Sequence, residues 1–220
     1  SNLCADPMLS IDEFAGEESW FSLDLASKID ICAFVQVFRK RLNDQNHYYV
    51  FGRYYLPEQT IEETKVNQGA YRKWVAMGQL TPTDGAEVDF DFVRDDVLAL
   101  SNKVQVREIV YDPWRATHLA HQLTNEGAVC VEMNQGKHAA ISQAMDEVTA
   151  ACKTGRLHHD GNQALAWMIS NVVRKERNGM GIPHKEKPEQ KIDGAIALLQ
   201  AISRCMLSGQ EVPSHGFVLL

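Results

Sequence analysis

The chain lacks several features that mark common classes of protein. No apolar run approaches the roughly 18 residues that a membrane-spanning helix needs. No basic segment followed by an apolar stretch opens the chain, so no secretion signal is visible. The 5 cysteines are scattered and form no C-x-x-C pair, which argues against structural zinc and for a reducing compartment. These absences predict a soluble globular protein without a disulfide framework.

Length and composition are ordinary for one domain. The chain has 220 residues, of which 45% are hydrophobic and 23% charged. A chain of this size buries roughly 70% of its unfolded surface, enough for a sizeable core. We expect residues 1–18 to be a lead-in or the remnant of a linker, and residues 19–220 to form a single domain.

Charge is unevenly distributed along the chain. The 22 basic and 29 acidic residues give a net charge of −7, which counts mildly against a nucleic-acid partner. Basic residues nevertheless cluster, and most such clusters are solvated surface. The clusters are Arg39-Lys40-Arg41, Arg72-Lys73, Arg174-Lys175 with Arg177, and Lys185, Lys187 and Lys191. The last cluster differs from the others, because it leads directly to Asp193.

Hydrophobic periodicity predicts hairpins first and alternating strands and helices afterwards. We expect strands at 20–26, 31–38 and 47–55, then helices at 58–77 and 92–100. A strand at 104–112, a helix at 113–125 and a strand at 128–133 follow. Helices at 138–153 and 162–173, a polar loop at 174–190 and a last helix at 192–207 complete the chain. This order predicts an α/β fold on the ribonuclease H-like plan, a mixed sheet of five or more strands with helices on both faces. By analogy with that plan, the first and fourth strands are parallel neighbours.

Three aspartates stand at unusual places in these elements. Asp24 interrupts the apolar strand Trp20–Leu25, where aspartate is disfavoured and no helix cap can explain it. Asp112 precedes Pro113 and fits a helix N-cap. Asp193 opens the last helix, where an acid complements the helix dipole. Taken singly, Asp112 and Asp193 are explained by capping, whereas Asp24 is not.

Together the three acids predict a metal centre. Carboxylates brought together repel one another, and a divalent cation relieves that conflict. Three or four carboxylates can hold two metal ions about 3.5–4 Å apart for hydrolysis of a phosphodiester. Hard oxygen ligands favour Mg²⁺ or Mn²⁺ over zinc. Asp30 is either an outer ligand or a turn-stabilising residue.

Other candidate groups are weaker. His158 and His159 are adjacent on an extended segment and point opposite ways, so a shared metal is not expected. His118 and His121 have helical spacing but no third ligand, which indicates surface residues. No cysteine has a convincing base partner in the sequence, so we do not expect a thiol nucleophile.

The aspartates lie in segments that resemble the C-terminal nuclease domain of the large terminase subunit of tailed bacteriophages. The likeness spans about residues 20–207, and the order and spacing of the segments carry it. The segments are Leu23-Asp24-Leu25-Ala26-Ser27-Lys28-Ile29-Asp30, Val110-Tyr111-Asp112-Pro113-Trp114, Met133-Asn134-Gln135-Gly136, Leu157-His158-His159-Asp160-Gly161-Asn162 with Trp167 and Asn171, and Lys191-Ile192-Asp193-Gly194-Ala195-Ile196-Ala197-Leu198.

The resemblance implies a metal-dependent endonuclease that cuts concatenated double-stranded viral DNA during genome packaging. It implies that Asp24, Asp112 and Asp193 are the catalytic, metal-binding residues. His159, Asn171 and a lysine of the loop before the last helix, either Lys185 or Lys187, become possible neighbours of the site. We expect DNA to contact that loop and the strand edge Arg53-Tyr54-Tyr55.

The resemblance also implies that the ATPase domain of a large terminase is missing from this chain. No segment matches the phosphate-binding motif G-x-x-x-x-G-K-[ST] of the terminase ATPase, so we expect an excised domain that cuts DNA without translocating it. The implied partners are that ATPase domain, the small terminase subunit and the procapsid portal, in the host cytoplasm. Two alternatives stay open: a non-catalytic DNA-binding or assembly module, and a junction resolvase or transposase-like nuclease of the same fold.

Overall fold

The structure is a computed structural model that describes residues 4–26, 28–133 and 138–208. In chain order the elements are η2, a 3-10 helix (Ile11–Phe14), β1 (Glu18–Asp24), β2 (Cys32–Leu42), β3 (Gln45–Pro57), α1 (Glu58–Glu63), α2 (Gln68–Ala76), β4 (Thr81–Thr83), α3 (Phe90–Ser101), β5 (Gln105–Tyr111), α4 (Pro113–Asn125), β6 (Cys130–Glu132), α5 (His138–Lys153), β7 (Leu157–His159), α6 (Gln163–Ser170), β8 (Val173–Arg177), β9 (Met180–His184) and α7 (Asp193–Leu207).

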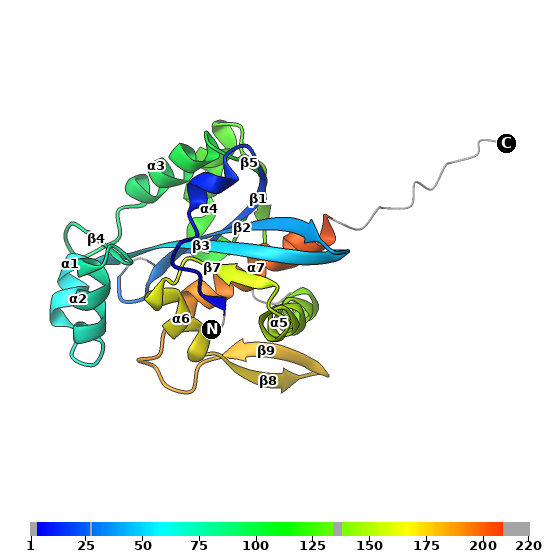
Figure 1. The fold of residues 1–220 in the computed structure, drawn as a ribbon. Coiled ribbons are helices and arrows are strands. Elements are labelled where there is room, and N and C mark those ends of the chain that lie inside the picture. The colour runs from blue at the N-terminus through cyan, green and yellow to red at the C-terminus, as the bar shows by residue number, and fades with distance from the viewer. Residues whose placement is uncertain (1–3, 27, 134–137, 209–220) are drawn as a thin grey trace.

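A mixed seven-stranded sheet forms the centre of the molecule (Figure 1). Its strand order is β4-β3-β2-β1-β5-β6, and β7 pairs with β3 beyond the end of β4. Strands β1, β2 and β3 form an antiparallel meander, whereas β5 joins β1, and β6 joins β5, in parallel. The predicted mixed sheet, with hairpins first and the strand at 104–112 parallel to the first strand, is therefore confirmed.

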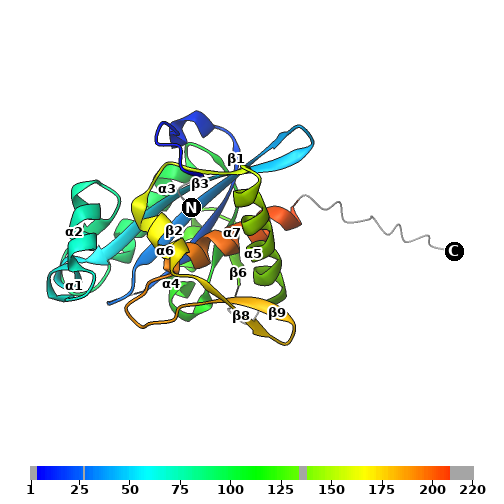
Figure 2. The same ribbon diagram turned by 60° about the horizontal axis from the view of Figure 1, so that its bottom comes forward.

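Strand alternation sends two sets of side chains to opposite faces of the sheet. On β1, Phe21 and Leu23 pack with α3 and α4, whereas Trp20 packs with α5, α6 and α7. Figures 1 and 2 show these two helical layers on either side of the sheet. Both faces are apolar because both are covered, as predicted from the order of strands and helices.

Three local predictions were wrong. The polar loop expected at 174–190 contains the antiparallel hairpin β8–β9. Its turn places Asn178 and Gly179 at φ 52° and 74°, the left-handed backbone that an Asn-Gly hairpin turn requires, and this signal was missed. The helix expected at 58–77 is two helices, since Thr64 adopts extended backbone and ends α1. The short strands β4 and β7 were not predicted.

Residues 4–18 are packed rather than loose. Cys4 and Phe14 are buried in the two halves of the core, and the Asp6 amide donates to the carbonyl of His159 at 2.7 Å. The segment expected to be a lead-in therefore contacts the core at two residues, and the division of the chain at residue 18 stays a prediction. Among the described helices, none has both the length and the apolar character needed to cross a lipid bilayer.

Candidate metal centre

Asp24 and Asp112 lie at the ends of neighbouring parallel strands. Asp24 is the last residue of β1, and Asp112 follows β5 directly. In the β1–β5 register Leu23 pairs with Tyr111, so the two aspartates come next, side by side. Strands β1 and β5 are central in the sheet, which places both acids at the carboxyl edge where parallel strands end.

The last helix brings the third acid to the same edge. Asp193 is the first residue of α7, which packs across β1 and β2. The buried Ser22 hydroxyl of β1 hydrogen-bonds Gln200 Oε1 of α7 at 2.9 Å, and this contact fixes the helix against the strand that ends in Asp24. This hydrogen bond holds α7 against β1, the two elements that carry Asp193 and Asp24.

Gly194 allows α7 to approach this closely. A Cβ atom at this position would lie 2.5 Å from Met168 Cε and 2.9 Å from a ring carbon of Tyr54. The segment ahead of the helix is tied down as well, because Asn171 Nδ2 donates to the carbonyl of Lys191 at 2.9 Å. Packing on both sides of Asp193 therefore determines where its carboxylate lies.

A cavity of about 860 Å³ lies at the meeting point of these elements. Its lining includes all three predicted ligands, the possible outer ligand and two further residues of interest: Asp24, Asp112, Asp193, Asp30, Lys185 and Trp114. The four carboxylates come from β1, the β1–β2 connection, the start of α4 and the start of α7. The structure thus gathers acids that are up to 169 residues apart in the chain, from Asp24 to Asp193.

Burial and the repulsion of neighbouring carboxylates raise the pKa of two acids of this cavity, Asp24 and Asp193. The pKa of Asp24 is raised well above its ordinary value by burial, then by the charges of Asp193, Asp112 and Asp30, while Lys185 acts in the opposite direction. Burial and the charge of Asp30 raise the pKa of Asp193 to about 6. A cation among these carboxylates would stabilise their ionised forms.

Asp112 both caps α4 and lines the cavity. Its Oδ1 accepts a hydrogen bond from the Trp114 amide at 2.9 Å, and Pro113 occupies the first helical position, so the capping interpretation is confirmed. The carboxylate of Asp112 also lines the cavity. Capping orients the carboxylate and does not compete with a role at the cavity.

Asp193 does not cap its helix. Ile192 is the N-cap residue of α7 and no side chain caps the helix there. Asp193 Oδ2 is buried and has no hydrogen-bond partner in the described part of the chain. A buried carboxylate oxygen without a donor is unfavourable unless a cation satisfies it, so this atom fits a metal ligand.

The acids line an open cavity. Among residues 4–26, 28–133 and 138–208, no group of three or more His, Cys, Asp or Glu side chains is already arranged to hold a metal ion. The donors available are carboxylate oxygens, the type that Mg²⁺ and Mn²⁺ prefer, and Mg²⁺ commonly keeps several waters or substrate oxygens. The residues present therefore fit a hard divalent cation whose remaining ligands come from solvent or substrate.

Asp30 is held at the cavity by Lys191. Lys191 Nζ lies 2.5 Å from Asp30 Oδ1, and only 11% of the lysine side chain is exposed. Lys191 is therefore part of the local charge balance rather than a free surface cation. The two alternatives for Asp30 stay compatible with this geometry, since the residue both lies in the β1–β2 connection and lines the cavity.

The structure separates the remaining predicted residues. Lys185 lines the cavity, and Lys187 is exposed just beyond it. Arg53 points to α3, where its guanidinium pairs with Asp96 Oδ1 at 2.5 Å, and it does not line the cavity. Asp96 thus partly neutralises Arg53, and contact of this residue with DNA stays a prediction.

His159 and Asn171 do not line the cavity either. His159 is buried in β7, which pairs with β3, and its Nδ1 accepts from the Gly161 amide at 3.1 Å. His158 instead stacks on Tyr49 and His47, so the adjacent histidines do point opposite ways. Asn171 donates a hydrogen bond to the Lys191 carbonyl and so holds the segment that precedes Asp193. Residues 134–136 of the predicted segment lie outside the described residues.

Sequence reasoning missed two residues of the cavity. Trp114 and Arg115 line it beside Asp112. Trp114 stands directly after the Asp112-Pro113 pair, so its proximity to Asp112 was available from the sequence, but its 85% exposure was not. Arg115 carries no motif that would have identified it.

Residues 4–209 match one protein family, the terminase large subunit, endonuclease domain. The chain is 37% identical over 217 residues to protein YmfN of Escherichia coli strain K12. That alignment covers 94% of this chain and 48% of YmfN. The chain spans about half the length of the curated relatives it matches, 48% in one case and 42% in another.

Solved structures agree in fold. The crystal structure of the HK97 bacteriophage large terminase is similar with a TM-score of 0.78 and 26% identity, over 92% of this chain and 42% of that chain. The large terminase nuclease from thermophilic phage G20c with bound magnesium has a TM-score of 0.54 and 11% identity, over 84% of this chain and 80% of that chain. The predicted ribonuclease H-like fold is confirmed. Since the family match extends over nearly the whole chain, the chain belongs to the terminase large subunit endonuclease domains.

Proposed function

We propose that this terminase nuclease domain cleaves double-stranded viral DNA concatemers by metal-dependent hydrolysis during genome packaging. One observation carries the proposal: carboxylates from β1, from the start of α4 and from the start of α7 line a single cavity. Two of them, Asp24 and Asp193, have raised pKa values because each is buried among like charges. Such an arrangement is unfavourable in a purely structural role and suits a cation-binding centre.

Asp24, Asp112 and Asp193 would hold Mg²⁺ or Mn²⁺, with Asp30 as an outer ligand. The partnerless Oδ2 of Asp193 and the position of Asp112 in the lining of the same cavity support this choice. The similar G20c nuclease was crystallised with bound magnesium. When bound, two divalent ions would activate the attacking water and stabilise the leaving 3′-oxygen.

The chain's own residues would orient the substrate and the ligands. Lys185 at the cavity supplies a positive charge for a phosphate oxygen and, by the same charge, lowers the pKa of Asp24. Lys191 holds Asp30 through the ion pair at 2.5 Å. Water attacks phosphorus in line with the bond to the 3′-oxygen, and that bond breaks to leave a 5′-phosphate and a 3′-hydroxyl.

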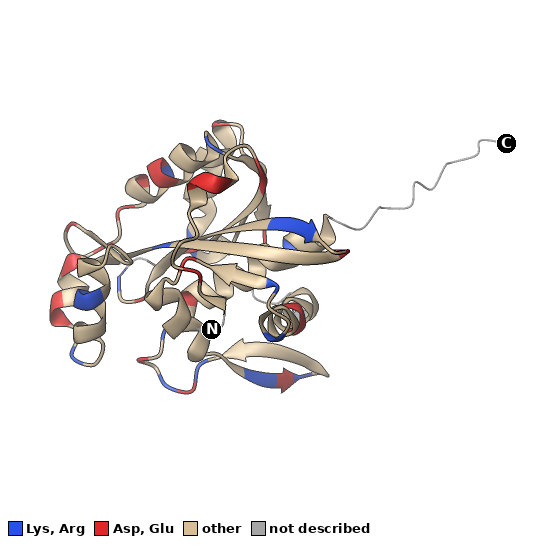
Figure 3. Cartoon of the chain, viewed as in Figure 1, with Lys and Arg blue, Asp and Glu red and all other residues tan. Residues whose placement is uncertain are grey.

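The charge distribution supports weak, salt-sensitive binding of DNA. Figure 3 shows basic residues on β8 and in the segment before α7, whereas acidic residues are frequent on α1 and α3. The segment before α7 carries Glu186 and Glu189 as well as its lysines, and its Lys185 lines the cavity, where it could contact a phosphate. The net charge of −7 limits affinity, and we propose that the remainder of the full-length protein, the small terminase subunit and the procapsid portal provide tight engagement in the host cytoplasm.

The Asp24→Asn variant tests the proposal directly. We expect the wild-type chain to nick and linearise plasmid with Mg²⁺ or Mn²⁺, and the variant to lose at least ~100-fold in rate, because the amide cannot supply the ligand charge. Plasmid gel electrophoresis measures this, and circular dichroism checks the fold. The exposed Asp91→Asn change on α3 is the matched control and should leave the rate unchanged.

Two results would contradict the proposal. Unchanged cleavage by Asp24→Asn removes that residue from the mechanism. Absence of Mn²⁺ binding in calorimetry at millimolar concentration favours a non-catalytic DNA-binding or assembly module. Preference for a four-way junction over plasmid would instead indicate a resolvase-like enzyme of the same fold.

A further inference from the structure

Trp114 is far more exposed to solvent than Trp20 and Trp74. Trp20 and Trp74 are 1% and 4% exposed, and Trp167 packs against Trp74 with ring centroids 5.3 Å apart. Trp114 is 85% exposed. A large flat indole left in water is common at recognition sites, where it offers broad contact area with few rotatable bonds.

The exposed indole belongs to the cavity of the candidate metal centre. Trp114 lines that cavity together with Asp24, Asp112 and Asp193. The position of its backbone is fixed, because its amide donates to Asp112 Oδ1 at 2.9 Å in the first turn of α4. The carboxylate expected to hold a cation therefore also fixes the residue that carries the indole.

Cations accompany the indole. Lys185 and Arg115 line the same cavity, on the β9–α7 segment and on α4. A positive side chain can bind a phosphate, while an aromatic face can stack on the base of the same nucleotide or its neighbour. Aromatic and basic residues in one groove are the usual means of holding a nucleic-acid strand without reading its sequence.

We propose that the Trp114 indole stacks on a nucleobase next to the scissile phosphate. This inference rests on the proposed function and names the DNA contact that orients the strand in the cavity. The contacted base leaves the duplex stack, its face covers the indole, and the adjacent phosphate lies toward Lys185 and the three acids. Because every base has such a face, the contact tolerates any sequence.

Tryptophan fluorescence in EDTA tests the contact without cleavage. We expect a single-stranded oligonucleotide of about 12 nucleotides to quench the emission of the wild-type chain. The Trp114→Phe variant should keep most of its affinity, because phenylalanine also stacks, but should show no such quenching. The difference between the two proteins assigns the signal to Trp114, since the other three tryptophans remain in both.

Cleavage of a duplex with a missing base tests the position of the contact. The cuts in a short duplex are first mapped, and an abasic nucleotide is then placed beside the main cut. We expect Trp114→Ala to lower the cleavage rate of the intact duplex about ten-fold. The abasic nucleotide should lower the wild-type rate by a similar factor and have little further effect on Trp114→Ala, because both changes remove one stacking contact.

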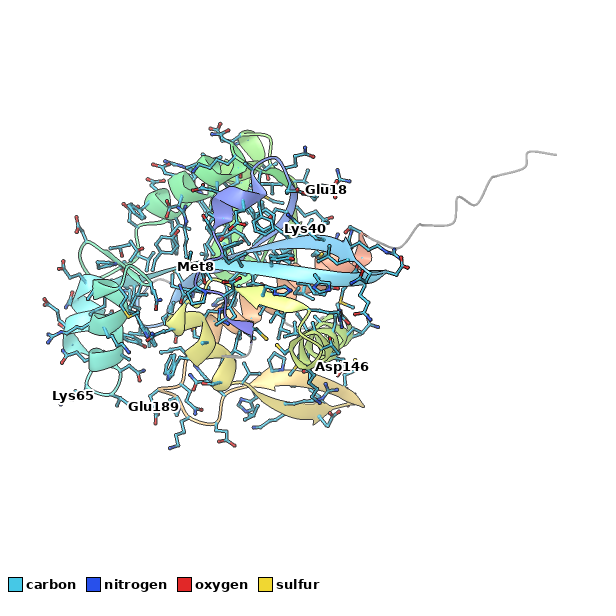
Figure 4. All side chains as sticks on the ribbon, in the orientation of Figure 1. Met8, Glu18, Lys40, Lys65, Asp146 and Glu189 are labelled. Atoms are coloured by element: carbon cyan, nitrogen blue, oxygen red, sulfur yellow. The ribbon has the colours of Figure 1, made fainter. Side chains whose placement is uncertain are left out.

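Met8→Ala is the matched control, because Met8 is 87% exposed and lies near β3 and β7, away from the cavity (Figure 4). It should behave like the wild-type chain in both assays. Unchanged Trp114 emission at DNA concentrations that support cleavage overturns the stacking proposal and favours a protein contact for the indole. Equal abasic sensitivity of wild type and Trp114→Ala also overturns it. Quenching without any metal-dependent cleavage would leave the stacking contact standing and overturn the proposed nuclease function instead.

Discussion

Two aspartates at helix N-termini show how one residue type can serve different purposes. Asp112 uses one oxygen to cap α4, whereas Asp193 begins α7 without capping it and keeps a buried oxygen with no partner. From the sequence both were equally explained as caps. The difference arises because Ile192 takes the cap position at α7 and directs Asp193 into the cavity, which local sequence preferences do not specify.

Asp193→Asn should stabilise the metal-free protein above pH 6. The folded pKa of about 6 exceeds the ordinary value of 3.8, so ionisation favours the unfolded chain and stability falls as pH rises from about 4 to 6. The uncharged variant avoids this loss, which is on the order of 3 kcal/mol. Urea denaturation in EDTA at pH 4 and pH 7.5 measures it.

The stabilising effect of Asp193→Asn should be present at pH 7.5 and nearly absent at pH 4, where both proteins carry no charge at this position. Asp91→Asn, at an exposed site on α3, is the control and should show no such difference. If the stability difference between the wild-type chain and Asp193→Asn is the same at both pH values, ionisation of Asp193 in the cavity does not cause it.

At the scale of elements, the site depends on how α7 approaches the sheet. Strand β1 contributes Asp24 and Ser22, and helix α7 contributes Asp193 and Gln200, so one hydrogen bond and one close glycine contact set the distance between two ligand-bearing elements. The helix itself was predicted at 192–207, with its end correct and its start within one residue. Its packing partners were not, because a helical pattern shows which face is apolar but not which residues of a strand it meets.

Gly194→Ala should damage the site more than the fold. Its Cβ would lie 2.5 Å from Met168 Cε and 2.9 Å from the Tyr54 ring, so α7 or its neighbours must shift. We expect a loss of stability of about 1–3 kcal/mol. Displacement of Asp193 should lower the cleavage rate by up to ~100-fold. Thermal denaturation and plasmid cleavage measure the two effects.

Gly69→Ala is the matched control for this change. Gly69 lies within α2 and a Cβ there would meet no atom within 4 Å. Removing a glycine from a helix should stabilise the chain by about 0.5–1 kcal/mol and leave cleavage unchanged. If Gly194→Ala behaves like Gly69→Ala, the close contact does not position Asp193.

At the scale of the molecule, three parts of the chain come together at one cavity. The β1 end, the β5–α4 junction and the start of α7 each bring one acid, so a bound cation would connect both helical layers to the sheet. Metal binding should therefore raise the free energy of unfolding of the whole domain. Ligand bound to the folded state alone stabilises it by about 2.7 kcal/mol at 100 times the dissociation constant.

Mn²⁺ should raise the melting temperature of the wild-type chain. Asp24→Asn, Asp112→Asn and Asp193→Asn should each lose most of this increase, because each removes one charged ligand. Asp112→Asn is informative because asparagine is also a good N-cap, so α4 keeps its cap while the charge disappears. Differential scanning calorimetry with and without Mn²⁺ measures the change, and an undiminished increase in all three variants would exclude this cavity as the metal site.

The sequence by itself determined the order of strands and helices, the mixed sheet and the three acids as candidates. Those properties follow from hydrophobic periodicity, turn chemistry and the rarity of aspartate inside an apolar strand, all of which are local. Only the tertiary structure decided which predicted residues share the cavity. It paired Arg53 with Asp96, placed His159 in β7 beside β3 and left the Trp114 indole in water beside Asp112. These outcomes depend on contacts between distant segments, which close packing selects and local sequence does not encode.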